Sequence, residues 1–275
     1  MAHELSELPA PPLTEYRLAQ SDALDGRSLE LELVDGGHLE LSIDSGRTAR
    51  WRTADVPWAG REVLGEGSEP WANAGEGPAD VVQVAPETWM VDVDCARPAL
   101  DSLVVVAAKA TGWAIVVHQS RFHPRETWSR GPAVVQTFAA ARIAGGEQHG
   151  PLPAPTRDLI GARHLLRYDR NNLYEHVYLN SERFCSHNVH TRGTPGRADC
   201  HPASYWKLAD GLYVFAWREY DSAAAMVFTY NLNDLRATGM AHAPDTFMRS
   251  ENRPIGGHIL PVTETVSYPD GLTPR

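Results

Sequence analysis

The chain has 275 residues, of which 43% are hydrophobic and 22% charged, and its formal net charge is −10 at pH 7. A chain of this length can bury a large core in one or two domains. The acidic balance excludes a nucleic-acid partner, because phosphates require an excess of Lys and Arg. No apolar run reaches the roughly 20 residues of a membrane span, and the polar start "MAHELSELPAPP" lacks the apolar centre of a secretory signal. Three cysteines without a CxxC pair do not make a disulfide framework. We therefore expect a soluble cytoplasmic protein with reduced thiols.

The order of segments along the chain predicts two β-rich domains. Residues 1–24 are rich in Pro, Ala and Glu and are typical of a tail or a docked arm. Short alternating runs fill residues 25–145, beginning with "SLELELVDGGHLELSID", in which Asp-Gly-Gly marks a hairpin turn. Residues 146–158 are dense in Gly and Pro and indicate a linker, after which residues 159–275 resume the alternation. Without a sustained helical period, regular short strands favour a sandwich or a barrel.

The two halves also resemble each other. "RSLELELVDGGHLELSIDSGR" aligns without a gap on "RHLLRYDRNNLYEHVYLNSER", pairing Arg27 with Arg163 and Arg47 with Arg183. We interpret this as a duplicated β-unit, each copy about the size of a small closed barrel. Closure of each unit would remove the exposed edges of an open sheet.

The strand "KLADGLYVFAWRE" places a carboxylate in line with aromatic rings. Period-two alternation puts Tyr213, Phe215, Trp217 and Glu219 on one face. Inside a barrel, Glu219 would lose water and its pKa would rise, which makes it a candidate general acid or base. The alternative is a solvated strand-end carboxylate paired with an arginine.

Other polar clusters favour structural roles. "FCSHNVH" and "DCHP" bring together Cys185, His187, His190, Cys200 and His201, yet the usual spacing of zinc ligands is absent, so we expect buried thiols, polar-loop histidines and no metal. His118 and His123 in "HQSRFHPRETW" fit a solvated loop. No GxSxG, P-loop, GxGxxG or HExxH motif is present, so we expect no cofactor.

The second half nevertheless resembles a known family. "LIGARHLLRYDRNNLYEHVYLNSERFCSH", followed by "GRADCHPASYWKLADGLYVFAWRE", is similar to the C-terminal domain of the MoaF family. That family has an N-terminal and a C-terminal domain, both of the lipocalin-like (calycin) type. The resemblance implies an all-β chain of two tandem lipocalin-like antiparallel β-barrels.

"LIGARHLLRYD", "LYEHVY" and "KLADGLYVFAWRE" are also, more distantly, similar to phenolic acid decarboxylases, which are cofactor-independent lipocalin-like barrels. This resemblance implies that Glu219 is the acid/base, Arg197 the anchor for a carboxylate, and Tyr168 with Tyr174 the orienting hydroxyls. Leu166 stands where that family has another cavity tyrosine, so the reaction need not be decarboxylation. The expected substrate-binding wall comprises Tyr213, Trp217, Phe215, Leu166, Tyr178 and His187.

We therefore expect a lyase-type enzyme (decarboxylase-, hydratase- or cyclase-like) acting on a small aromatic or unsaturated acid in the C-terminal barrel. The alternatives left open are a non-catalytic carrier of a small aromatic or hydrophobic ligand, and an interaction scaffold without a site. The sequence is compatible with a homodimer.

Overall fold

The protein is built from β-strands in every part that the structure describes. The computed structural model describes residues 13–45, 47–58, 71–95, 101–121, 133–191, 195–220, 222–244 and 250–261. These residues form 17 strands and no helix, so they contain no helical segment that could span a membrane. The strands form two closed antiparallel barrels in tandem, which confirms the predicted fold class.

The first barrel is an eight-stranded ring in chain order, closed by pairing of its first and last strands at Leu31 and Ile143. The predicted Asp-Gly-Gly turn joins its first two strands, with Gly36 and Gly37 at φ of 95° and 100°, where glycine avoids a steric penalty. Its strands are β1 (Arg27–Leu33), β2 (His38–Ile43), β3 (Thr48–Ala54), β4 (Ala74–Ala85), β5 (Thr88–Asp94), β6 (Asp101–Ala108), β7 (Trp113–Arg121) and β8 (Val134–Ile143).

The second barrel repeats this ring. Its strands are β10 (Arg163–Asp169), β11 (Asn172–Asn180), β12 (Arg183–His190), β13 (Ala198–Ala209), β14 (Leu212–Arg218), β15 (Ala225–Asn231), β16 (Arg236–Pro244) and β17 (Ser250–Pro261). Pairing of β12 with β13 closes it, and the short β9 (Ala154–Pro155) lies inside the predicted linker and pairs with the other half of β13. The fourth strand of each ring has 12 residues and the fifth has 7, as expected of a duplicated unit.

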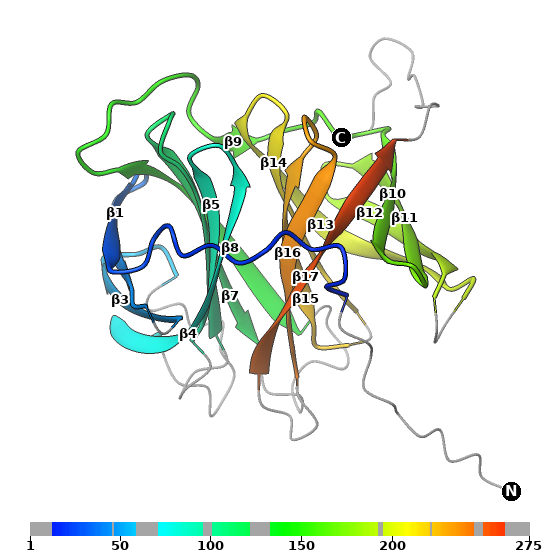
Figure 1. The fold of residues 1–275 in the computed structure, drawn as a ribbon, viewed down its shortest axis with the longest axis horizontal. Coiled ribbons are helices and arrows are strands. Elements are labelled where there is room, and N and C mark those ends of the chain that lie inside the picture. The colour runs from blue at the N-terminus through cyan, green and yellow to red at the C-terminus, as the bar shows by residue number, and fades with distance from the viewer. Residues whose placement is uncertain are drawn as a thin grey trace, which may run out of the picture.

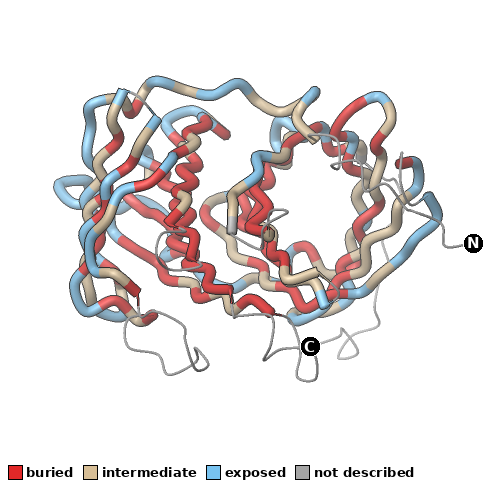
Figure 2. Tube along the Cα trace, turned by 90° about the horizontal axis from the view of Figure 1, so that it is seen from below, coloured by how far each residue is buried: buried red, intermediate tan, exposed pale blue. Residues whose placement is uncertain are grey.

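The two barrels lie side by side, and the strands between them are buried (Figures 1 and 2). The wall that they share is apolar. One core fills the first barrel and another fills the second, while a third joins outward-facing residues of both, including Val104, Ile115, Val214 and Met240. Strands β6 and β7 are buried along their whole length because one face looks inward and the other meets the second barrel. This two-sided burial explains why their sequences are nearly continuous aliphatic runs.

A small polar cluster interrupts this wall. Asn252 of β17 donates to Asp92 Oδ1 (2.5 Å) and to Ser102 Oγ (2.9 Å) of the first barrel, and its Oδ1 lies 2.8 Å from His242 Nδ1. Burial, followed by the charges of Asp80 and Asp94, raises the pKa of Asp92 well above its ordinary value. Because these bonds join one barrel to the other, they fix the lateral register of the contact.

The N-terminal segment crosses both barrels on the face seen in Figure 1. The Tyr16 amide donates to the Tyr168 carbonyl of the second barrel (3.1 Å), and Arg17 forms an ion pair with Asp80 of the first. Residues 13–24 therefore strap the two rings together.

Two local expectations were wrong. Cys185 and Cys200 are not free thiols but form a disulfide, because β12 and β13 place them directly opposite each other. His118 is not in a solvated loop: it lies on β7 with 5% exposure, beside Asp101 (3.3 Å) and stacked on Trp58 (5.3 Å between ring centroids). His123 lies outside the described residues.

Candidate functional site in the second barrel

The interior of the second barrel is lined with aromatic rings. Tyr213, Phe215 and Trp217 of β14 all point into it, because alternate residues of a strand face the same side. Phe215 stacks on Trp217 (5.1 Å), and Trp217 stacks on Phe228 of β15 (5.4 Å). The opposite face of β14 belongs to the wall shared with the first barrel. These rings pack against one another, so the interior is lined with flat apolar surfaces.

A chain of hydrogen bonds runs through these rings. His164 Nδ1 lies 3.1 Å from the Tyr178 hydroxyl, which donates to the Tyr230 hydroxyl at 3.2 Å, and Tyr230 lies 3.1 Å from His176 Nδ1. Since Tyr178 donates to Tyr230, the proton of Tyr230 is left for His176, and the oxygen of Tyr178 can accept from His164. The hydrogen bonds among these four side chains therefore all run in one direction, from His164 through Tyr178 and Tyr230 to His176.

Burial keeps this chain uncharged. It lowers the pKa of His164 to about 4 and, together with the smaller effects of His164 and His201, lowers the pKa of His176 to about 3. Burial likewise raises the pKa values of Tyr178 and Tyr230 above the ordinary range. Near neutral pH the chain therefore offers polar groups without charge.

Glu219 stands at the end of the aromatic row of β14. It is half-buried, its amide donates to the Ala224 carbonyl (2.9 Å), and its carboxylate accepts a hydrogen bond from the Ser222 hydroxyl. The β13–β14 pairing ends with Ala203 opposite Trp217, two residues before Glu219. Burial, then the charges of Asp169 and Glu219, raise the pKa of Tyr174, which places Glu219 within electrostatic reach of that phenol.

Other predicted catalytic residues lie toward the same end of the ring. Tyr168 is 3% exposed, and its ring meets that of Tyr174 at 5.4 Å. Arg197 precedes β13 and forms an ion pair with Asp199, with half of its side chain exposed. β13 starts at the end where its antiparallel neighbour β14 finishes, so Arg197 and Glu219 share that end. The structure therefore brings these four groups to one end, with Arg197 at its solvent-exposed edge.

The predicted binding residues are more widely distributed. Leu166 and Tyr178 are fully buried in the interior with Phe215 and Trp217. Tyr213 lies toward the opposite end, where its hydroxyl donates to Asp158 (3.1 Å). His187 lies on the outer face, since its neighbour Phe184 points inward three residues away, and it pairs with Glu175 (3.1 Å).

The cysteine–histidine segment does not build a metal centre in the parts of the chain described. No three His, Cys, Asp or Glu side chains come together in a metal-ligating arrangement there. Both cysteines of this segment are joined in the disulfide, which removes their thiolates as ligands.

Comparison with known proteins assigns this barrel. Residues 153–265 match the model of the MoaF C-terminal domain. This segment of the chain is therefore similar to the MoaF C-terminal domain. The chain is also 34% identical over 147 residues to "Protein MoaF" of Klebsiella aerogenes, an alignment that covers 52% of this chain and 55% of that protein. The chain thus spans about half the length of this curated relative.

A solved structure adds nothing to the assignment. A crystal structure of "a putative beta-lactamase from Burkholderia vietnamiensis" is covered completely by 40% of this chain at 12% identity. Its TM-score of 0.34 is too low to support an inference.

The match to the MoaF C-terminal domain extends from β9 through β17 and therefore includes every strand of the aromatic-lined barrel. Sequence reasoning missed His176, His201 and Tyr230 as members of the interior. Alternation held the signal for two of them: His176 stands two residues before Tyr178, and Tyr230 two residues after Phe228. His164 carried the same signal, because it stands two residues before Leu166 and four before Tyr168, whose side chains belong to the interior.

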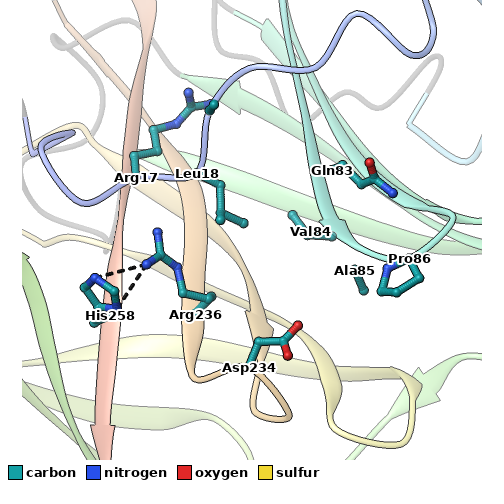
Figure 3. Close-up of a pocket in the computed structure, with 10 residues that line it drawn as sticks. Arg17, Leu18, Gln83, Val84, Ala85, Pro86, Asp234, Arg236 and His258 are labelled. Carbon is teal, nitrogen blue, oxygen red and sulfur yellow. Dashed lines mark hydrogen bonds between the residues drawn. The ribbon is translucent and has the colours of Figure 1, made fainter.

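A cleft lies where the second barrel meets the first barrel and the N-terminal strap (Figure 3). It has a volume of about 780 Å³, and its charged lining residues are Arg17, Asp234 and Arg236. Arg17 is already paired with Asp80, and Arg236 already donates to His258 (3.0 Å) and to the Tyr16 carbonyl. The terminal nitrogens of these guanidinium groups have partners, while the Nε atom of each makes no hydrogen bond among the described residues. We place the candidate site inside the barrel, where Glu219 ends the aromatic row.

Proposed function

We propose that the second barrel binds a small aromatic or unsaturated acid, and that Glu219 exchanges a proton with it in a cofactor-independent lyase-type reaction. The observation that carries this proposal is the pairing of a ring-lined, uncharged interior with one half-buried carboxylate at the end of its aromatic row.

The interior supports recognition of an aromatic body. Stacked and edge-on rings such as Trp217, Phe215 and Phe228 provide flat apolar contacts. The neutral pair of His176 and Tyr230 provides hydrogen bonds without the desolvation cost of a charge. An anionic group on the ligand fits best toward the exposed end, where Arg197 lies.

The chemistry needs only a proton donor and acceptor. In an elimination, the Glu219 carboxylate takes a proton from carbon, the C–H electron pair forms the new double bond, and the leaving group departs with its own bonding pair. Addition of water to the double bond reverses these steps. In a decarboxylation, the C–C electron pair stays on the substrate as CO2 departs, and protonated Glu219 supplies the proton to that carbon.

Leu166 shapes the choice among these reactions. It is fully buried in the interior and offers no hydroxyl, so a charge developing beside it receives no hydrogen bond there. The absent donor is worth about 1–3 kcal/mol in a dry site. The reaction on an aromatic or unsaturated acid therefore need not be decarboxylation.

The proposal is tested with Glu219→Gln in the full chain. Turnover of a panel of hydroxycinnamates and related unsaturated acids, followed by liquid chromatography, should fall at least about a hundredfold. Ligand binding measured by calorimetry should change little, because the amide preserves the shape of the side chain. Glu182→Gln, at an exposed turn, serves as the matched control and should keep full activity. Unchanged turnover in Glu219→Gln would disprove the role of this carboxylate.

A carrier is the second candidate function, and the ion pair of Arg197 with Asp199 favours it. A guanidinium already neutralised by a carboxylate binds a substrate anion less strongly. Ligand binding without turnover in the wild-type chain would support the carrier. Cytoplasmic location and a homodimer stay predictions; thiol titration of the isolated protein bears on the first, because cytosolic thiols are kept reduced, and sedimentation tests the second.

A further inference from the structure

Several buried polar atoms of the second barrel make no hydrogen bond among the described residues, and one of them, Nδ1 of His201, belongs to a residue of the inward-facing row. His201 is 6% exposed, and its Nδ1 is fully buried and makes no hydrogen bond in the parts of the chain that the structure describes. By contrast, His164 and His176 each bond a tyrosine hydroxyl through Nδ1. An unpaired buried polar group costs about 1–3 kcal/mol, so the position of His201 calls for an explanation.

The surroundings of His201 point into the candidate site. It follows the alternation of Ala203 and Tyr205, whose side chains belong to the interior core. Its cross-strand neighbour on β12 is Phe184, whose ring lies 5.9 Å away, and His201 lies toward the same end of the barrel as Glu219, which follows β14. His201 also contributes to the lowered pKa of His176, so the two imidazoles lie within electrostatic reach of each other.

The neighbours of His201 limit what can satisfy its Nδ1. A buried water needs two to four polar partners, whereas the ring of Phe184 occupies one flank. The aromatic interior accepts a flat apolar body, and a hydroxyl on that body can both donate to and accept from an imidazole nitrogen. A ring with a hydroxyl near the Glu219 end meets both requirements.

We infer that His201 Nδ1 binds the hydroxyl group of a hydroxylated aromatic ligand in the second barrel, and so determines the preference of the site for phenols over plain arenes. This inference rests on the proposed function, because it needs aromatic binding in the same interior. It assigns His201 a specificity role and leaves proton transfer to Glu219.

The test compares 4-ethylphenol with ethylbenzene, which differ by one hydroxyl and are both uncharged at pH 7, on the full chain by calorimetry. The wild type should bind 4-ethylphenol roughly 5- to 150-fold more tightly, the ratio expected of one buried hydrogen bond. His201→Leu should abolish this preference while leaving ethylbenzene affinity within about threefold, because the apolar contacts remain.

Two amide variants separate recognition from folding. Asparagine places its amide near the position of Nδ1 and glutamine places it near Nε2, so His201→Asn should keep most of the preference and His201→Gln should lose it. Melting curves of the three variants identify any that fail to fold.

The outcomes distinguish this inference from the proposed function. Equal affinity of the wild type for both compounds, or an unchanged preference in His201→Leu and His201→Gln, would overturn the role of His201 while leaving aromatic binding intact. Failure of the wild type to bind either compound would overturn aromatic binding itself, and the inference with it.

Discussion

The stability of the second barrel should depend on pH through His176. This side chain is 2% exposed, and its burial lowers its pKa from 6.5 to about 3. A histidine whose pKa is lower in the folded state stabilises the fold fully above the unfolded pKa, and this contribution is lost as pH falls through 6.5 toward 3. Between pH 7.5 and 5.0 the two pKa values give a loss of about 2 kcal/mol in the free energy of unfolding.

The variant His176→Phe isolates this contribution. It fills a similar volume but cannot bind a proton, and at pH 7.5 it should be less stable than the wild type because Tyr230 loses its partner. Urea unfolding followed by tryptophan fluorescence should show that this deficit is smaller by about 2 kcal/mol at pH 5.0. Only the wild type loses stability at the lower pH, because its unfolded state binds a proton at this imidazole and its folded state does not. His190→Gln, at an exposed position, is the control and should lose stability with pH as the wild type does. A deficit that is the same at both pH values would refute the assignment of a neutral, buried His176.

Three further predictions concern the polar contact between the two barrels, the disulfide that joins β12 to β13, and the close packing of β16. Asn252→Leu should lower the free energy of unfolding by about 2–4 kcal/mol in urea titrations, because Asp92, Ser102 and His242 lose their common partner; a neutral result would show that water replaces the amide. Thiol titration of the unfolded chain should find one free thiol without reductant and three with it, and Cys200→Ser should cost about 3 kcal/mol, as expected for a closed loop of 15 residues; three thiols without reductant would contradict the disulfide. Gly239→Ala should cost about 1–3 kcal/mol in the same unfolding assay, because the new Cβ would lie 2.5 Å from the Val227 carbonyl and 2.6 Å from the ring of Phe228; wild-type stability would mean that the strands can move apart at little cost.

The sequence was sufficient for the strands and for the duplication, because both depend on local alternation. "LYVFAWR" has the two-residue period of a strand, and the matched segments beginning at Arg27 and Arg163 each open a barrel. Alternation could not show that both faces of β14 are buried. Val214 reads as an outward-facing residue until the first barrel is placed against it.

The site was predicted only as far as the strand register could be known. Glu219 and Trp217 belong to one strand, so their shared face follows from spacing alone. The position of His201 opposite Phe184, and the bond between Cys185 and Cys200, depend on how β12 and β13 align across their connection. Spacing along the chain does not determine that alignment, so the histidine and the disulfide were misjudged together.

The shared wall makes the stability of each barrel depend on the other. Residues such as Val104 and Val214 face neither solvent nor a ligand but the flank of the adjoining ring. If the segment matching the MoaF C-terminal domain were expressed alone, this flank would become a large exposed hydrophobic patch, and the fragment would tend to aggregate. A substitution in this wall alters the packing of both barrels at once. We therefore expect the wall residues to change more slowly in evolution than the outer strands of the same barrels.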